Sequence, residues 1–467
     1  MKKTYLTTSI AYTNAPPHIG YALELVQADS YARFKRSIGE DVWFLTGTDE
    51  HGLKINQKAK ELGIDTIDFC NNMSAMFLKL IKELNISNND FIRTTDQEKH
   101  WPSVIKLWND LVENGDIYEK EYEGQYCVGC EAFVAPRDIV DGMCAIHKKA
   151  PEKVKENNYF FRLSKYSNQI LECLEKDIIK VTPQSRKNEM ISFIKSGLED
   201  VSFSRPKDKV GWGIPVPGDD NQLIYVWADA LTNYISAISD NLNDYWPADV
   251  HFVGKDISKF HILIWPAMLM SLGLSLPKNI FIHGFITVDG QKMSKSLGNV
   301  IDPFELIEKY GADAFRYYFL REITPTEDGD FSYLKFQERY NADLVGGLGN
   351  LVARVNAMAK KVSIEGLVIE KEITDLVNNI RSQRDEAMES FKFSVALASI
   401  WELISFADKY IEENKPWEKD AKNKEQVICN LTHLIKSIGE LIAPFMPKTS
   451  SNILNNVSGH LFERYVD

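Results

Sequence analysis

Strand and helix signals alternate in two separated stretches of this chain, and this split constrains the fold more than any other feature. Residues 4–12 are rich in β-branched and aromatic side chains and predict a strand, followed by a helix at about 18–37 and a strand at 42–46. The alternation returns with strands at about 250–253 and 280–286. Strand, loop and helix in this order form half of a parallel α/β sheet. The sequence therefore predicts one parallel sheet interrupted by an inserted domain.

A chain of 467 residues is too long for a single hydrophobic core, so we expect three or four folding units. Amphipathic runs without strand signals predict an antiparallel helical bundle, with helices at 342–362, 373–388, 391–413 and 424–443. The expected boundaries are 1–116 and 226–290 for the split sheet, 117–225 for the insertion, 291–340 for a connecting region and 341–467 for the helical domain.

The composition is that of an ordinary soluble protein, with 44% hydrophobic and 26% charged residues. No apolar run approaches the roughly 20 residues that a membrane span needs, and the N-terminus has neither a secretory nor a transit pattern. We therefore expect a cytoplasmic protein without a membrane partner. The net charge of −12 argues against non-specific binding to nucleic acid, but a local basic cluster could still bind RNA.

The first chemical motif is Pro17-His18-Ile19-Gly20-Tyr21, at the junction of the first strand and helix. A helix N-terminus offers unpaired N–H groups and a partial positive charge to a phosphate, and Gly20 lets a nucleotide approach the backbone. His18 could donate a hydrogen bond to negative charge developing on that phosphate. Taken alone, the motif is equally consistent with a proline-rich turn before a capped helix.

The second motif is Lys292-Met293-Ser294-Lys295-Ser296, which follows the turn Asp289-Gly290. Two lysines in a loop can neutralise charge that grows on a leaving phosphate group. The alternative is a solvated basic loop, the usual meaning of a short charge run. The two motifs together, each following one half of the α/β pattern, favour a nucleotide-dependent enzyme.

Four residues form a metal-ligand pattern in the predicted insertion: Cys127, Cys130, Cys144 and His147. Two turn-bound pairs of sulfur and nitrogen ligands suit tetrahedral Zn²⁺, and a closed set of four indicates a structural ion. The alternative is two chance pairs of buried thiols. Because the segment of about 120–150 is small, bound metal would supply much of its folding free energy.

Residues 18–21 and 292–296 resemble the HIGH and KMSKS signatures of class I aminoacyl-tRNA synthetases. The resemblance covers the whole chain. It implies an α/β fold with a Rossmann-like parallel sheet, split by a zinc-binding connective insertion and followed by an all-α anticodon-binding helical bundle. It also implies that residues 291–340 hold the KMSKS loop and a stem-contact region. The implied reaction uses ATP with Mg²⁺: an amino-acid carboxylate attacks the α-phosphorus, and a hydroxyl of the 3′-terminal adenosine of tRNA then takes the aminoacyl group.

One signature position departs from this family. Tyr21 stands where the pattern has a second histidine. A phenol can still hydrogen-bond a phosphate, but it carries no positive charge at neutral pH. We expect an active enzyme with an altered rate.

The insertion narrows the choice of amino acid. Only about 110 residues lie between the sheet halves, which is too few for the editing domain of the leucine, isoleucine and valine enzymes. The chain is similar to the methionine-specific enzymes of bacterial type, with a single zinc knuckle and no appended C-terminal tRNA-binding domain. The stretches that carry the similarity are 15–20, 46–52, 225–234, 253–256 and 283–285. The resemblance implies L-methionine, ATP and tRNA(Met) as ligands, and we expect a monomer.

The same resemblance implies site residues. Asp49 and the backbone of Ile10 would hold the substrate ammonium, and the thioether would be surrounded by Tyr12, Trp227, Ala230, Leu231, Tyr234, Phe260 and His261. The residues facing ATP would be His18, Gly20, Glu24, Gly254, Asp256, His283, Ile286 and Lys295. Catalysis would rest on His18, Tyr21, Lys292 and Lys295.

An aromatic pocket suits a polarisable thioether, since each contact of sulfur with a ring edge contributes about 0.3–1.5 kcal/mol. A Tyr234 hydroxyl that reached the sulfur would separate methionine from an all-carbon isostere. For any single aromatic residue, ordinary core packing is the simpler explanation. The joint match of the pocket residues is what favours a methionine site.

The resemblance also implies that the helical bundle reads the CAU anticodon through Asn350, Arg354 and Trp417. Asn350 and Arg354 are four residues apart and therefore share one helix face. Trp417 follows a proline at a helix end, where an exposed indole could stack on an unpaired base with about 1–3 kcal/mol. Alternatively, Trp417 fills the interior of the bundle.

Two rival functions remain at this point. One is a different class I synthetase or a simpler nucleotidyltransferase with a HIGH-type signature, against which the 225–234 stretch argues. The other is a tRNA-binding or regulatory paralogue that has lost amino-acid activation, for which Tyr21 is the only indication.

Overall fold

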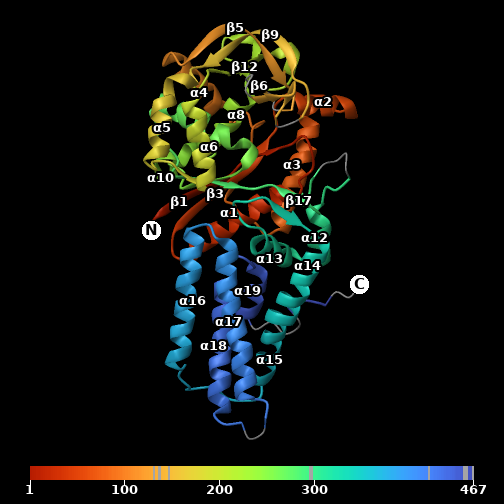
Figure 1. Ribbon diagram of the computed structural model, residues 1–467, viewed down its shortest axis with the longest axis vertical. Helices are drawn as coiled ribbons and strands as arrows, with labels where there is room; N and C mark the ends of the chain where they lie inside the picture. The colour runs from red at the N-terminus through yellow and green to blue at the C-terminus, as the bar shows by residue number, and fades with distance from the viewer. Residues whose placement is uncertain are drawn as a thin grey trace. The chain divides into compact units, whose positions relative to one another are not determined.

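The computed structural model describes residues 1–129, 132–134, 138–145, 148–293, 298–418, 421–455 and 461–464 (Figure 1). The chain forms two compact units. The first contains residues 1–16, 41–79 and 88–282, and the second contains residues 17–40, 80–87 and 283–467. Both units are therefore assembled from separate stretches of sequence.

The first unit is built on a seven-stranded sheet, and the strand pairs along β1 and β3 are parallel as predicted. The order is β10-β16-β15-β1-β3-β2, and β4 also pairs with β3. The strands are β1 (Lys3–Thr8), β2 (Ala11–Tyr12), β3 (Asp41–Asp49), β4 (Asp90–Arg93), β10 (Lys180–Thr182), β15 (Val250–Gly254) and β16 (Asn279–His283). All five residues of β15 are buried, which explains its nearly continuous apolar sequence.

The single strand expected at 4–12 is in fact two strands. β1 pairs with one edge of β3, and β2 pairs with its opposite edge. The chain therefore crosses from one side of β3 to the other between Thr8 and Ala11. Gly47 of β3 lies very close to β4, because a Cβ added there would be 2.1 Å from the carbonyl oxygen of Ile92. Only glycine permits this approach.

Helices pack with the sheet around one large core in the first unit. They include α4 (Trp101–Glu113), α8 (Val226–Leu231), α9 (Asn233–Ser236) and α11 (Trp265–Ser271), with the π-helical turn η5 (Phe260–Ile264) before α11. The helices α2 (Leu53–Leu62) and α3 (Thr66–Glu83) contribute to a separate small core. Val104, Leu107, Trp108 and Leu111 of α4 follow helical spacing and are buried in this core. Sheet and helices thus fix the frame of the candidate site.

The predicted insertion contains antiparallel strands. β5 (Ile117–Cys127) pairs with β9 (Glu152–Phe161), and smaller strands follow: β6 (Ala132–Val134), β7 (Ile139–Val140), β8 (Met143–Cys144), β11 (Val201–Ser202), β12 (Ser204–Pro206), β13 (Pro215–Val216) and β14 (Asp219–Ile224). The helices α5 (Ser167–Glu175) and α6 (Gln184–Lys195) lie in the same stretch, and β10 between them pairs with β16 of the large sheet.

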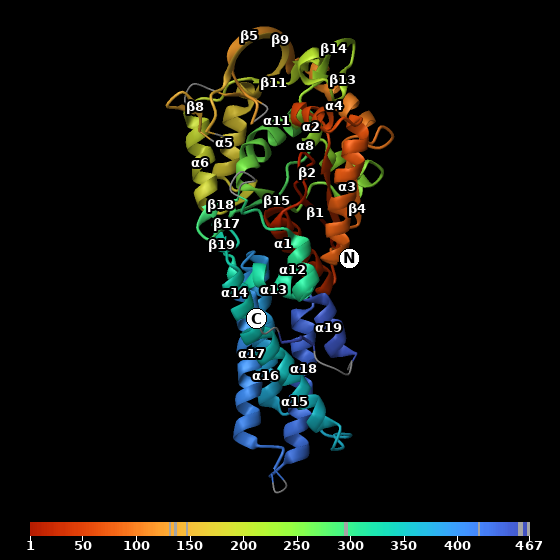
Figure 2. The same ribbon diagram turned by 90° about the vertical axis from the view of Figure 1, so that its right-hand side faces the viewer.

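The second unit begins with α1 (Ile19–Ser37), which matches the predicted helix, and continues through a small sheet of β17 (Ile286–Val288), β18 (Gln291–Lys292) and β19 (Gly329–Phe331). The predicted helical bundle is confirmed. Its members are α15 (Asn350–Ala359), α16 (Lys371–Glu389), α17 (Phe393–Asn414), α18 (Lys424–Ile442) and α19 (Pro447–Leu454), and α12 (Pro303–Tyr310), α13 (Ala312–Glu322), α14 (Tyr333–Arg339) and η6 (Tyr340–Gly349) precede them. Figure 2 shows α16, α17 and α18 together in this bundle.

A buried ion pair ties α1 to the helical part of this unit. Asp29 of α1 lies 2.7 Å from Nη1 of Arg316 in α13, and both side chains are fully buried. Arg316 also donates to the carbonyl oxygens of Phe445 at 2.7 Å and Pro444 at 2.9 Å. Removing one partner of such a pair leaves an uncompensated buried charge. The signature helix α1 is therefore held by charge and hydrogen bonds as well as by packing.

Candidate active site

An aromatic cluster forms where α8, α9 and η5 meet in the first unit. The rings of Trp227 and Phe260 stack with centroids 3.8 Å apart, and His261 lies edge-on to Trp227 at 6.4 Å. Tyr234 contacts His261 with ring centroids 5.7 Å apart. Ala230 and Leu231, on the same helix as Trp227, are buried beside them. The structure thus brings together four of the predicted side chains, Trp227, Tyr234, Phe260 and His261, with Ala230 and Leu231 on the helix of Trp227.

Tyr12 lies on β2, where it pairs with Asp49 of β3. With Met73 and Trp212 it packs against a small core of Ile55, Ala59, Phe69 and Cys70. Ile10 packs against the large core. Tyr12 and Asp49 are therefore neighbours at this edge of the sheet.

The hydrogen bond between Tyr234 and His261 has a defined direction. Nδ1 of His261 lies 3.0 Å from the carbonyl oxygen of Ile257, which can only accept, so Nδ1 carries a proton. Burial lowers the pKa of His261 to about 4, although the bond to Ile257 opposes this shift. The ring is therefore neutral at pH 7, and its Nε2 accepts a hydrogen bond from the Tyr234 hydroxyl at 2.6 Å.

This bond bears on the expected contact between Tyr234 and sulfur. A thioether is a weak acceptor, whereas a neutral imidazole nitrogen accepts hydrogen bonds well. To donate a hydrogen bond to a bound thioether, the Tyr234 hydroxyl would have to give up its bond to His261. In the described structure the Tyr234 hydroxyl donates to His261.

Asp49 ends β3, at the carboxyl edge of the parallel sheet where ligands of such folds bind. It is buried, and its backbone carbonyl accepts hydrogen bonds from Thr13 N at 3.0 Å and Thr13 Oγ1 at 3.1 Å. The neighbouring Glu50 forms two 2.8 Å bonds with the guanidinium of Arg93. Glu50 is therefore paired with Arg93, and the backbone N–H of His51 donates to an Asp49 carboxylate oxygen at 3.4 Å.

Sequence reasoning missed a buried network next to Asp49. Asp229 of α8 accepts hydrogen bonds from His51 Nδ1 at 2.6 Å and from His100 Nε2 at 2.8 Å. Burial raises the pKa of the Asp229 carboxyl, but the neighbouring His51 and His100 more than offset this effect and hold the pKa below its ordinary value. His51 and Asp229 lie in stretches that carry chemistry, but nothing local in the sequence marks His100 as their partner.

His18 is the N-cap of α1 in the second unit, and its Nδ1 accepts a hydrogen bond from Gly20 N at 3.0 Å. In the neutral ring the proton then resides on Nε2, which is the nitrogen that can donate. The His18 side chain is exposed, and Tyr21 on the first turn is half-buried. The capped-helix interpretation and the phosphate-donor interpretation are thus compatible.

Other residues predicted to face ATP are divided between the two units. In the second unit, His283 Nε2 lies 2.8 Å from the Glu24 carboxylate, and Ile286 starts β17. In the first unit, Gly254 ends β15 and Asp256 is exposed just after it. The backbone of Lys292 lies in β18, whereas its side chain and the whole of Lys295 lie outside the described residues.

Two of the four predicted zinc ligands lie in one small cluster. Cys127 and Cys144 are buried with Val134, and Ile139 packs against them. Cys130 and His147 lie outside the described residues. Among the residues that are described, no group of three or more His, Cys, Asp or Glu side chains is arranged to hold a metal ion.

Arg354 and Trp417 come together in the helical unit. The Arg354 guanidinium lies 5.9 Å from the indole centroid and 2.6 Å from a Glu412 oxygen. Trp417 is 48% exposed, so it does not fill the interior of the bundle. Asn350 is the first residue of α15 and is exposed, one turn before Arg354.

Comparison with known proteins identifies the family of the chain. Residues 4–140 and 128–356 match the family described as class I tRNA synthetases (M), and residues 370–464 match the anticodon-binding domain of tRNA ligase. The methionine–tRNA ligase of Caldanaerobacter subterraneus subsp. tengcongensis is 45% identical over 477 residues, which cover 98% of this chain and 74% of that protein. The enzyme of Brucella suis biovar 1 is 41% identical over 474 residues, which cover 97% and 91%.

A solved structure is similarly close. Mycobacterium tuberculosis methionyl-tRNA synthetase in complex with methionyl-adenylate superposes with a TM-score of 0.91 at 37% identity, over 97% of this chain and 94% of that one. Among the described residues, no helix has the length and apolar character needed to cross a bilayer. The family matches, the identity over nearly the whole chain and the shared fold lead to one conclusion: the chain belongs to the methionine–tRNA ligases, class I aminoacyl-tRNA synthetases that charge tRNA(Met) with methionine.

Proposed function

We propose that the wall of Trp227, Tyr234, Phe260 and His261 holds the methionine side chain while Asp49 binds the substrate ammonium. The observation that carries this proposal is the stacked and hydrogen-bonded arrangement of these four rings. Ring edges suit a polarisable sulfur, and the buried surroundings favour an apolar side chain over a polar one. A carboxylate at the end of β3 supplies the charge that an ammonium group requires.

The reaction would begin with activation of methionine. The methionine carboxylate attacks the α-phosphorus of ATP, a new P–O bond forms, and the bond to the β-phosphate oxygen breaks as pyrophosphate leaves. His18, with its proton on Nε2, would donate to charge that develops at the α-phosphate. Lys292 and Lys295 would neutralise the leaving pyrophosphate, and Mg²⁺ bound with ATP would supply further positive charge to the phosphates.

The second step transfers methionine to tRNA. A hydroxyl of the 3′-terminal adenosine attacks the carbonyl carbon of the adenylate, and AMP leaves with the bonding electrons. The helical domain would select the tRNA through the CAU anticodon, with Trp417 stacking on an unpaired base and Arg354 beside it. The exposed indole and its contact with Arg354 support this assignment.

The donor set of the insertion fits a structural zinc ion. Cys127 and Cys144 lie in one buried cluster, as two members of a tetrahedral site must. Cys130 and His147 would complete the four ligands. A bound ion would stabilise this small segment rather than take part in the reaction.

The direct test of function is ATP–pyrophosphate exchange with each of the twenty amino acids. Methionine alone is expected to support exchange, and Asp49→Asn is expected to raise the KM for methionine about tenfold or more because a charge-assisted contact is lost. Exchange with a different amino acid would contradict the specificity. Absence of all exchange in a protein that still binds tRNA would identify a regulatory paralogue.

Tyr234→Phe tests how sulfur is recognised. The Tyr234 hydroxyl donates its hydrogen bond to His261 and not to the substrate. We therefore expect the preference for methionine over norleucine to change less than about threefold, measured as a ratio of kcat/KM. Tyr166→Phe is a matched control, since it removes another buried hydroxyl of the first unit, which donates to Asp116. A tenfold loss of preference in Tyr234→Phe alone would mean that its hydroxyl binds the sulfur.

Metal analysis tests the zinc assignment. Freshly purified protein is expected to contain about one zinc ion per chain, and Cys127→Ala or Cys144→Ala should reduce that content. Cys173→Ala, at a buried cysteine outside the cluster, should retain it. Chelation should increase hydrogen exchange near residues 120–150 and lower activity. Protein that is free of zinc when fresh would refute the site.

Trp417→Ala tests the anticodon contact. The KM for tRNA(Met) is expected to rise by about 5- to 100-fold, equivalent to the loss of one stacking contact, while exchange without tRNA stays nearly unchanged. Trp401 stacks on Tyr317 at 4.5 Å, so Trp401→Ala is a structural comparison that should impair both assays. Equal losses in both assays for Trp417→Ala would show that its role is structural.

A further inference from the structure

The buried carboxylate of Asp229 connects three elements that carry the proposed methionine site. Its Oδ2 accepts from His51, which follows Asp49 by two residues at the end of β3. Asp229 itself lies in α8, between Trp227 and Ala230. One hydrogen bond therefore joins the segment that would bind the ammonium to the helix that would line the thioether.

The second oxygen of Asp229 extends the connection. Oδ1 accepts from Nε2 of His100, and Nδ1 of His100 lies 2.7 Å from Oγ of Ser236. Ser236 ends α9, the helix that contains Tyr234. The network thus reaches both helices of the pocket wall, and all four of its side chains are buried.

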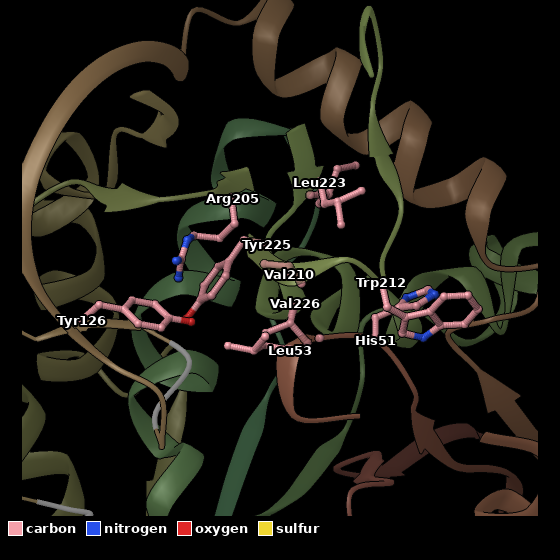
Figure 3. A pocket seen from close by; sticks show the side chains of 11 residues that line it. His51, Leu53, Tyr126, Arg205, Val210, Trp212, Leu223, Tyr225 and Val226 are labelled. Carbon is pink, nitrogen blue, oxygen red and sulfur yellow. The ribbon is translucent and has the colours of Figure 1, made fainter. Parts of the chain in front are cut away.

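Two aromatic rings and the hydrogen bond to Asp229 hold His51. Its ring lies edge-on to Trp101 at 5.9 Å and to Trp212 at 5.7 Å. His51 is only 2% exposed, and the cavity that it borders beside Trp212 has a volume of about 20 Å³ (Figure 3). The 2.6 Å hydrogen bond to Asp229 is the contact that ties this ring to α8.

We propose that Asp229 is a positioning residue for the amino acid, and that it sets the spacing between the ammonium-binding Asp49 and the thioether wall. This inference rests on the methionine site proposed above. Neither Asp229 nor His51 needs to touch the substrate. A ligand held at both ends is sensitive to that spacing, because misplacement of one end weakens the contacts of the other.

The predicted signature is selective. Asp229→Asn keeps the size of the side chain but presents an NH₂ group to one of two rings that each donate to a carboxylate, so one ring loses its acceptor. The distance between Asp49 and the rings that would line the thioether would then be less well fixed, which weakens methionine binding. ATP binding uses other elements, and its KM should change little.

The experiment uses the full chain with Asp229→Asn and measures the Kd for L-methionine by calorimetry and the KM values for methionine and ATP in exchange. We expect the Kd and KM for methionine to rise at least tenfold and the KM for ATP to stay within twofold. The matched control is Asp116→Asn, since Asp116 is also a buried carboxylate of this unit and accepts bonds from Lys165, Tyr166 and Ser271. It should leave both KM values unchanged even if the melting temperature falls.

His100→Gln gives a second measurement if Asp229→Asn does not fold, because a glutamine amide can still donate to Asp229. It should raise the KM for methionine less than His100→Ala does. Equal changes in the methionine and ATP constants, or an effect no larger than that of Asp116→Asn, would overturn the proposal. A wild-type chain inactive with methionine would instead refute the proposed function, so the two failures are distinguishable.

Discussion

The parallel pairing of β1 with β3 and β15 is the constraint on which the candidate site depends. It places Thr7 opposite His251 and Leu6 opposite Phe44, so that segments about 200 residues apart in sequence end at the same edge. Asp49 and Gly254 lie at the carboxyl ends of these strands. The intervening insertion adds β10 to the same sheet, next to β16.

Buried polar groups then give the pocket a defined geometry. The Tyr234 hydroxyl and the two oxygens of Asp229 are used in hydrogen bonds whose direction follows from the neighbouring acceptors and donors. Such networks are costly to bury unless every member is paired, but once paired they hold one arrangement. In the second unit Asp29 and Arg316 play the equivalent structural part for α1. Aromatic stacking supplies the surface, and these bonds determine where that surface lies.

Local sequence patterns predicted the elements and the motifs well, and contacts between distant residues poorly. The helix at 18–37, the alternating strands and the helical bundle follow from periodicity, and residues 18–21 with 225–234 carry the family resemblance. Periodicity gave no indication that the strand expected at 4–12 divides around β3, because pairing order is a tertiary property. Nor did it indicate that the strand expected at 280–286 is divided between β16 and β17, which belong to different sheets. The partnership of His100 with Asp229 and the direction of the Tyr234 bond likewise depend on contacts that no local spacing encodes.

The central claim is that one pocket holds a sulfur-containing side chain between aromatic rings with its ammonium at Asp49. A crystal structure of the chain with methionine and a non-hydrolysable ATP analogue tests it most directly. The account predicts the thioether against Trp227 and Tyr234, the ammonium within hydrogen-bond distance of the Asp49 carboxylate, and the Tyr234 hydroxyl still bonded to His261. Methionine density elsewhere, with these rings enclosing only other protein side chains, would contradict it.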